Sequence, residues 1–196
     1  MVTSATLYLA SRSPRRVELL KQLCLTCEIV PADIDEAQLS HELPEAYVKR
    51  LAQEKAEACL KNLSGAQRRH AVLAADTTVA IAGKVLGKPE DDQDARQMLQ
   101  TLSGRTHQVH TAVALAFADA IDVVLSTTLV EMMELSSAQI EHYLASNEHR
   151  DKAGSYGIQG LAGAWITRIE GSYTGVMGLP VYETANLLRK HGLIAL

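Results

Sequence analysis

This chain of 196 residues lacks a long hydrophobic run: no stretch approaches the roughly 18 uninterrupted apolar residues that a membrane span needs. Its start also lacks a basic segment followed by an apolar run and a cleavage site, so we expect no secretory signal. The cysteines are few and odd in number, namely Cys24, Cys27 and Cys59. We therefore expect a reducing, cytoplasmic location and no membrane partner.

Positive charge is also scarce, because 19 Lys and Arg face 23 Asp and Glu, which gives a formal net charge of -4. Broad binding to a nucleic-acid backbone needs a basic face, so we expect no nucleic-acid partner. A small phosphate ligand needs only a few local cations. Two motifs of common hydrolases are missing as well: the Gly-Lys pairs at 83–84 and 87–88 lack the rest of a P-loop, and there is no Gly-x-Ser-x-Gly elbow.

Hydrophobic residues (47%) and charged residues (21%) are both near globular averages, and the length suits one domain or two closely fused lobes. Apolar runs typical of strands alternate with amphipathic runs typical of helices. The predicted strands are residues 6–10, 26–31, 71–81, 106–117, 120–133 and 164–169. The predicted helices are residues 14–23, 45–60, 92–102, 137–146 and 180–191. This alternation predicts an α/β fold, with an antiparallel hairpin that turns at Asp119.

The turn after the first predicted strand carries an unusual charge pattern. Ser13 suits a helix N-cap, and Pro14 suits the first helical position, where no backbone N–H is needed. Arg15 and Arg16 then fall in the first turn, where the helix dipole disfavours cations. Helix N-termini attract anions, and the planar fork of arginine suits phosphate oxygens. We therefore expect a phosphate-bearing ligand at this turn, with a solvated helix end as the alternative.

Carboxylates and lysines recur beside the predicted strands. Asp76 interrupts an apolar strand, and burying it unpaired would cost several kcal/mol, so it must meet a cation, a metal, water at a cleft or a neighbouring turn. Glu36 ends an acidic run after the second strand, Lys55 lies in the second helix, and Lys88 lies in a turn after the Asp76 strand. Together they supply oxygen ligands for a divalent cation and positive partners for phosphates.

Four glycines at three-residue spacing, Gly154, Gly157, Gly160 and Gly163, predict a tight functional loop rather than regular structure. Glycines let the backbone approach a ligand closely, and Gln159 among them has donor and acceptor groups for a base edge. A plain structural loop is the alternative.

These blocks, in this order, resemble the Maf family of nucleoside triphosphate pyrophosphatases over almost the whole chain. The blocks are LYLASRSPRR (7–16), LAQEKA (51–56), ADT (75–77), GKP (87–89), LSGRTH (102–107), DKAG (151–154), GSY (171–173) and GLP (178–180). The resemblance implies a Maf/ITPase-like two-lobed α/β fold, with an elongated mixed β-sheet flanked by helices and a central cleft. It also implies that residues 1–196 form a single domain and that the protein is a homodimer.

The resemblance further implies that a divalent metal cation, Mg²⁺ or Mn²⁺, assists hydrolysis of a nucleoside triphosphate to the monophosphate and pyrophosphate. Asp76 falls on the family's proposed proton acceptor, and Glu36 and Asp76 would hold the metal. The positions that match polar, substrate-binding residues of the cleft are Ser13, Arg16, Glu36, Lys55 and Lys88. The positions tied to base choice are Arg15, Thr77 and Gln159.

This last trio resembles the subgroup that acts on dTTP and UTP, whereas the 7-methyl-GTP subgroup typically carries an aromatic residue at the position of Arg15. Arg12 departs from the family, which usually has a small residue there, and either adds a cation near the phosphates or points to solvent. Two alternatives stay open. One is a pyrophosphatase for 7-methyl-GTP or other modified nucleotides, in a house-cleaning role. The other is a nucleotide-binding regulator of cell division without catalysis.

Overall fold

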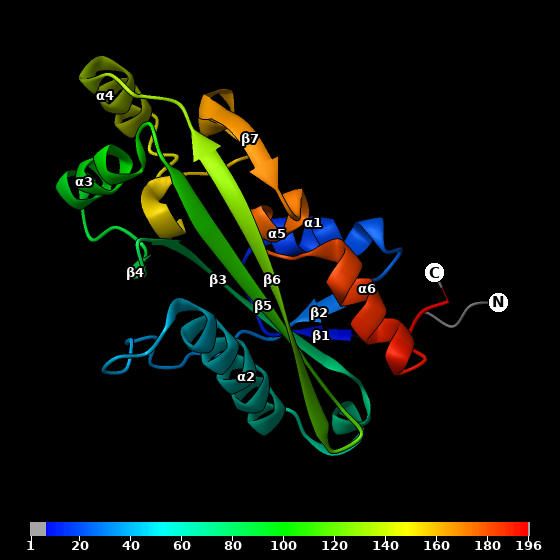
Figure 1. Ribbon diagram of the computed structural model, residues 1–196. Helices are drawn as coiled ribbons and strands as arrows, with labels where there is room; N and C mark the ends of the chain where they lie inside the picture. The colour runs from blue at the N-terminus through cyan, green and yellow to red at the C-terminus, as the bar shows by residue number, and fades with distance from the viewer. Residues whose placement is uncertain (1–6, 196) are drawn as a thin grey trace.

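The computed structural model describes residues 7–195, and one mixed sheet of seven strands runs through them (Figure 1). The strands are β1 (Leu7–Leu9), β2 (Cys27–Ile29), β3 (Val72–Ile81), β4 (Lys84–Leu86), β5 (Thr106–Phe117), β6 (Ala120–Met132) and β7 (Ile166–Glu170). The helices are α1 (Pro14–Gln22), α2 (Pro44–Asn62), α3 (Asp92–Leu102), α4 (Ser137–Ala145), α5 (Tyr173–Met177) and α6 (Val181–Lys190). Three short 3₁₀ turns are η1 (Gly65–Arg69), η2 (Ala153–Ser155) and η3 (Leu161–Trp165).

The strand order is β2-β1-β3-β5-β6-β7, and β4 pairs with β3 outside this path. β1 is parallel to β2 and β3, and the other pairs are antiparallel. β5 and β6 form the predicted hairpin. Ala118 and Asp119 at its turn have φ of 50° and 64°, the left-handed values that a two-residue turn requires.

Helices cover both faces of the sheet, since successive residues of β3 point to opposite sides. Val72 and Ala74 pack with α2, whereas Leu73 and Ala75 pack with α1 and α6. Figure 1 shows α2 and α6 on opposite sides of the long β5–β6 hairpin. The short apolar side chains along β3 and β5 allow these helices to lie close to the strands.

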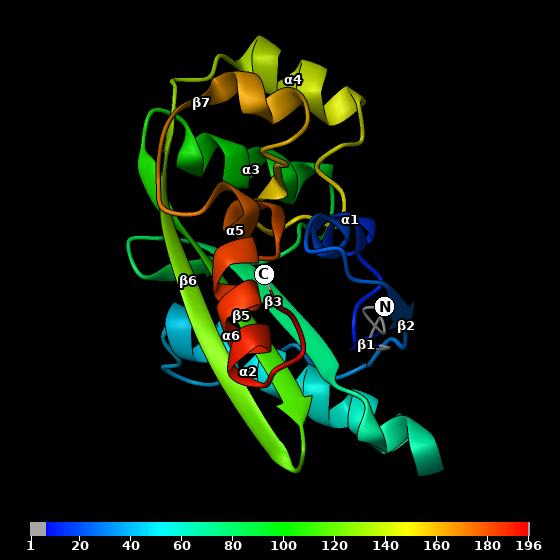
Figure 2. The same cartoon turned by 90° about the vertical axis from the view of Figure 1, so that its right-hand side faces the viewer.

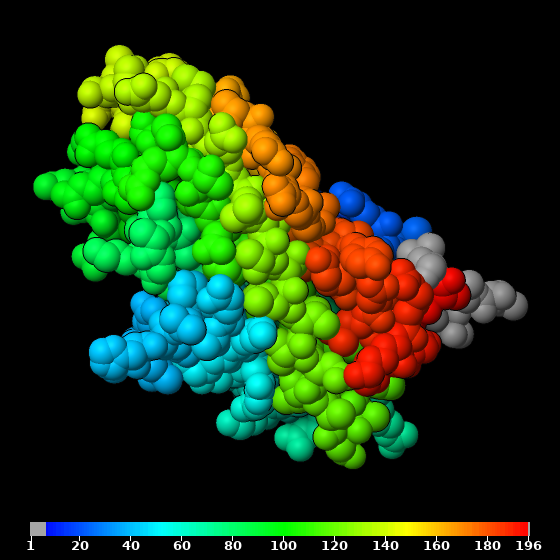
Figure 3. Space-filling view, viewed as in Figure 1, coloured from blue at the N-terminus to red at the C-terminus, as the bar shows by residue number. Residues whose placement is uncertain are grey.

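A separate core lies at the other end of the sheet. There α3 and α4 cover the ends of β3, β5 and β6, with Leu99, Ile140 and Tyr143 among the buried residues. Figure 2 shows α3 and α4 together at that end, away from α6. The surface is indented between this lobe and the segment of α2 with its preceding loop (Figure 3). The predicted α/β fold, an elongated mixed sheet flanked by helices with a cleft between lobes, is therefore confirmed.

Some predicted boundaries were wrong. Residues 164–165 lie in a 3₁₀ turn, so the last strand begins at Ile166, and Pro180 is the N-cap of α6 rather than its first residue. The sequence patterns missed β4 and α5, which have three and five residues, too few to show a period.

Residue 6 of the first predicted strand lies outside the described residues. Among residues 7–195, no helix is long and apolar enough to cross a membrane.

Candidate active site

A cleft of about 650 Å³ opens where one edge of β3 has no strand partner among residues 7–195. On this edge β1 pairs only with Val72 and Leu73, and β4 pairs only with the segment from Val79 to Ile81. Residues 74–78 between them keep only β5, on the opposite edge. Asp76 and Thr77 therefore reach the cleft from opposite faces of one strand, beyond the carboxyl end of β1.

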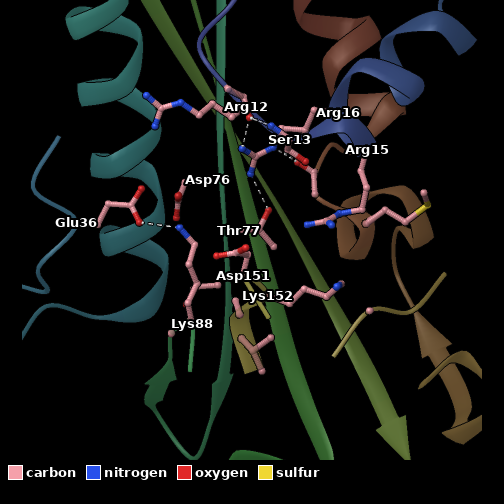
Figure 4. Close-up of a pocket in the computed structure, with 18 of the residues that line it drawn as sticks. Arg12, Ser13, Arg15, Arg16, Glu36, Asp76, Thr77, Lys88, Asp151 and Lys152 are labelled. Atoms are coloured by element: carbon pink, nitrogen blue, oxygen red, sulfur yellow. Dashed lines mark hydrogen bonds and ion pairs between the residues drawn. The ribbon is translucent and has the colours of Figure 1, made fainter. Parts of the chain in front are cut away.

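Asp76 faces α2, like Val72 and Ala74, and is only 8% exposed. Its Oδ1 accepts a hydrogen bond from the Lys55 ammonium at 2.7 Å, and the same ammonium lies 2.7 Å from Glu36 Oε1. Lys88 donates to Glu36 Oε2 at 3.3 Å (Figure 4). Asp76 thus meets a cation, as its burial required. Two carboxylates share one ammonium, with a second lysine at the rim.

Glu36 lies in the loop between β2 and α2, and α2 itself holds this loop. The Tyr47 hydroxyl donates to the Glu36 carbonyl oxygen at 2.8 Å, and Arg50 donates to the Ala37 carbonyl oxygen at 3.0 Å. Burial opposes the charged form of Glu36, but hydrogen bonds and positive charge from Lys55 and Lys88 outweigh it and lower its pKa. The carboxylate is therefore ionised at neutral pH.

Ser13 occupies the N-cap position of α1, but its side chain does not cap the helix, contrary to the sequence-based expectation. The Ser11 Oγ accepts from the Ser13 N–H instead, at 3.2 Å. The Ser13 hydroxyl lines the cleft. The helix start therefore presents a hydroxyl and backbone toward the position where the sequence predicts a phosphate.

Arg16 is fixed by neutral acceptors. Its guanidinium donates to the Gly178 carbonyl oxygen (2.8 Å), to Ser11 Oγ (3.0 Å) and to Thr77 Oγ1 (3.4 Å). A guanidinium has five N–H donors, so donors are left over for a ligand. Burial lowers the pKa of Arg16, and the nearby charge of Asp76 partly offsets this effect. No carboxylate among residues 7–195 pairs directly with this cation, so its charge is available to an anion.

Thr77 connects Arg16 to the neighbouring strand β5 and, through it, to α5. Its Oγ1 lies 2.9 Å from Thr111 Oγ1, and Thr111 donates its own proton to the Gly175 carbonyl oxygen at 2.7 Å. Because the Thr111 proton is used, Thr77 is the donor in the threonine pair and the acceptor from Arg16. The Thr77 hydroxyl is thus fully oriented before any ligand arrives.

Arg15 lies on the side of the cleft opposite Glu36 (Figure 4). Neither Arg15 nor Gln159 has a side-chain hydrogen-bond partner within the described part of the chain, and both line the cleft. Burial and the charge of Arg15 lower the pKa of Lys152, despite the opposing charges of Glu148 and Asp151. This wall is therefore electropositive, and two of its polar groups are free to meet a ligand.

The nine predicted site residues all line this one cleft: Ser13, Arg15, Arg16, Glu36, Lys55, Asp76, Thr77, Lys88 and Gln159. Around the cleft the structure places seven cationic side chains and four carboxylates: Arg12, Arg15, Arg16, Lys55, Lys88, Arg150 and Lys152 against Asp33, Glu36, Asp76 and Asp151. Arg12 pairs with Asp33 at 2.9 Å, and both are well exposed. An acidic chain of net charge -4 therefore concentrates positive charge at one cleft, which suits a multiply charged anion.

Sequence reasoning did not select Tyr47, Asp151 or Lys152 as site residues, although all three line the cleft. Asp151 and Lys152 directly precede the glycine-rich segment, so their place in the sequence could have identified them. No sequence feature marks Tyr47, because only the tertiary fold brings its hydroxyl to the Glu36 loop.

The carboxylates of Glu36 and Asp76 fit a divalent metal that takes most of its ligands from water and substrate. No group of three or more His, Cys, Asp or Glu within residues 7–195 is placed to hold an ion. Glu36 and Asp76, however, already contact a single cation, the Lys55 ammonium. Mg²⁺ typically binds through one or two carboxylates, with waters and substrate phosphates as its other ligands. These two residues therefore suit a metal that arrives with a phosphate ligand.

Comparison with known proteins gives a consistent result. The family model described as "Maf-like protein" matches residues 6–191. A dTTP/UTP pyrophosphatase of Methylobacillus flagellatus is 55% identical over 192 residues, which cover 98% of this chain and 96% of that protein. A dTTP/UTP pyrophosphatase of Chromobacterium violaceum is 54% identical over 95% of this chain and 94% of that protein.

Among solved structures, the Ham1 protein of Staphylococcus aureus aligns with a TM-score of 0.49 and 16% identity, over 65% of this chain and 71% of that chain. This similarity is too weak to identify a fold. The family model and the relatives, by contrast, extend over nearly the full length and include every residue of the cleft. The chain therefore belongs to the family of Maf-like proteins.

Proposed function

We propose that this protein hydrolyses nucleoside triphosphates, with dTTP and UTP as its substrates, to the nucleoside monophosphate and pyrophosphate. The observation that carries the proposal is the juxtaposition of the Asp76 carboxylate with unneutralised cations in one cleft. A binding protein needs the cations but not a buried carboxylate beside them. The names of the relatives supply the substrate class.

In the proposed reaction a water molecule attacks the α-phosphorus, and the bond from that phosphorus to the bridging oxygen breaks. Asp76 accepts the proton of the attacking water, and pyrophosphate leaves with the electron pair of the broken bond. Lys55 holds the Asp76 carboxylate in place through the 2.7 Å contact. Arg16 and Lys88 stabilise the negative charge that develops on the leaving group.

Glu36 and Asp76 would hold the divalent cation, Mg²⁺ or Mn²⁺. When bound, such a cation supplies Lewis-acid polarisation of the phosphate oxygens. The Lys55 ammonium lies 2.7 Å from one oxygen of each carboxylate, and the remaining lone pairs of both groups would serve the cation.

Base choice is assigned to Arg15, Thr77 and Gln159. Among residues 7–195, Arg15 and Gln159 have no side-chain hydrogen-bond partner on the cleft wall, whereas the Thr77 hydroxyl is already oriented. A wrong base leaves polar groups that would pair with the right base without partners, and such unpaired groups discriminate strongly between bases. Gln159 can donate and accept at once, so it suits the edge of a pyrimidine.

The test is pyrophosphate release from a panel of dTTP, UTP, CTP, the purine triphosphates and 7-methyl-GTP, with Mg²⁺ or Mn²⁺ added. We expect release from dTTP and UTP above all others, and loss of release with a chelator. Preference for 7-methyl-GTP would replace the substrate assignment. Nucleotide binding without release from any member would favour the regulator of cell division.

We also infer that residues 1–196 act as one domain, because a single sheet crosses both lobes. The cytoplasmic location and the homodimer stay predictions. Sedimentation analysis of the purified chain would test the dimer.

A further inference from the structure

We propose that Glu148 is a positioning residue for base selection: it holds the segment 157–161 so that Gln159 faces the cleft. This inference rests on the proposed function. It assigns a role to a carboxylate that does not itself line the cleft.

The Glu148 carboxylate contacts the far end of the segment directly and the near end through a tyrosine. Its Oε2 accepts from the Leu161 N–H at 3.0 Å, and its Oε1 accepts from the Tyr143 hydroxyl at 3.2 Å. The same hydroxyl accepts from the Gly157 N–H at 3.3 Å. One carboxylate and one phenol therefore hold both ends of the five-residue segment that carries Gln159.

Gly160 makes this contact possible. A Cβ at this position would lie 2.1 Å from Glu148 Oε1, a separation that real side chains do not adopt. The backbone of Gly160 has a φ of -108°, which any residue can adopt. A side chain at residue 160 would therefore displace the Glu148 carboxylate from its present position, although the backbone itself would accept one.

The segment depends on these contacts because Gln159 brings none of its own. The Gln159 side chain is exposed and has no hydrogen-bond partner in the described part of the chain. Its position against the cleft is thus set by the backbone that carries it. Tyr143, in contrast, is 1% exposed and packs its ring against Trp165 at 4.9 Å, so the support is anchored in the core.

Glu148 also reaches the cleft wall through its backbone. Its carbonyl oxygen accepts a hydrogen bond from the Lys152 ammonium, which lines the cleft. Residue 148 therefore contacts both Lys152 and the segment 157–161, which line the same wall of the cleft. A substitution at residue 148 removes the side-chain contacts with Leu161 and Tyr143 but keeps the backbone contact with Lys152, so the two effects can be told apart.

The experiment compares Glu148→Ala, Gln159→Ala and the double variant by kcat/KM for UTP, dTTP and CTP. We expect Glu148→Ala to change the UTP to CTP ratio by roughly tenfold, as misplaced binding groups do. When Gln159 is already replaced by Ala, Glu148→Ala should not alter the UTP to CTP ratio further. Glu148→Gln keeps an oxygen that accepts from the Leu161 N–H, so its UTP to CTP ratio should stay near the wild-type value. The matched control is Glu141→Ala, on α4, whose carboxylate pairs with exposed Arg96.

Amide hydrogen exchange without nucleotide supplies a readout that is independent of activity. Glu148→Ala should speed exchange at Gly157 and Leu161, and Glu141→Ala should not. Unchanged exchange, or an unchanged nucleotide ratio despite faster exchange, would overturn the proposal. If the wild-type protein released no pyrophosphate, the proposed function would fail, and the ratio of UTP to CTP dissociation constants would then decide the role of Glu148.

Discussion

At the scale of single residues, the cleft separates groups that are paired from groups that are free. Asp76 and Glu36 share the Lys55 ammonium, and Arg16 is anchored by neutral oxygens. Arg15 has no side-chain partner within residues 7–195. Before any ligand is bound, the Arg16 side chain is therefore held by hydrogen bonds, whereas that of its neighbour Arg15 is not. This difference gives each arginine a distinct expected role.

Asp76→Asn should fold like the wild type and lose about 10²–10⁴-fold in turnover of dTTP, because an amide cannot take the proton of water. Its carbonyl oxygen can still accept from Lys55, so the thermal midpoint should change little. Asp119→Asn, at the exposed hairpin turn, is the matched control. Near-normal turnover in Asp76→Asn would show that another group is the base.

Arg16→Ala should lower kcat for dTTP by about 10²–10³, the loss expected for one electrostatic donor. Arg15→Ala should mainly shift the ratio of kcat/KM among nucleotides. Arg16 also holds the Gly178 carbonyl, so thermal midpoints must accompany the kinetics. Identical kinetic changes in both variants would mean that the pair acts as one undivided clamp.

At the scale of elements, the glycine-rich segment contacts both the turn at Gly87 and strand β3. Gly154 in η2 donates its N–H to the Gly87 carbonyl oxygen at 3.0 Å, next to Lys88. The same residue lies against Val79 of β3, and its φ is 67°. The segment thus ties the lysine-bearing turn to the strand that carries Asp76. The predicted functional loop also has a structural reason for its glycines.

Gly154→Ala should destabilise the fold for two reasons. Left-handed backbone costs a non-glycine residue about 1–2 kcal/mol, and overpacking adds about 1–3 kcal/mol, since a Cβ would lie 2.8 Å from Val79 Cγ2. Gly65→Ala is the matched control, because its φ is 48° but nothing lies within 4 Å of the added Cβ. Urea unfolding measures both. Equal losses in the two variants would show that the Val79 contact relaxes at no cost.

At the scale of the whole molecule, one sheet joins three hydrophobic cores, one on each face near α2 and α6 and a third under α3 and α4. β5 contributes to all three and carries two buried histidines, His107 and His110. His107 is 2% exposed, and its Nε2 lies 2.7 Å from the Tyr156 hydroxyl. Burial lowers its pKa from 6.5 to about 4, and burial also lowers the pKa of His110. The stability of the molecule should therefore depend on pH below neutrality.

Between pH 6.5 and about 4 the unfolded chain binds a proton at His107 that the folded protein does not bind. The free energy of unfolding should therefore fall as the pH is lowered through this window, by up to about 3 kcal/mol from this residue, and level off below it. His107→Gln should show a smaller fall between pH 7 and pH 5 in urea titrations. An equal fall in both proteins would exclude His107 as a source of the pH dependence.

The sequence by itself determined the α/β alternation and the β5–β6 hairpin, because period and turn chemistry are local properties. Its ordered motifs, through the family resemblance they carry, pointed to nine of the residues that line the cleft. It could not show that Tyr47 holds the Glu36 loop or that Glu148 supports Gln159. Those contacts join segments that only tertiary packing brings together. The first turn of α1 illustrates the difference: sequence placed two arginines there, and the fold alone gave partners to Arg16 and left Arg15 without a side-chain partner in the part of the chain that the structure describes.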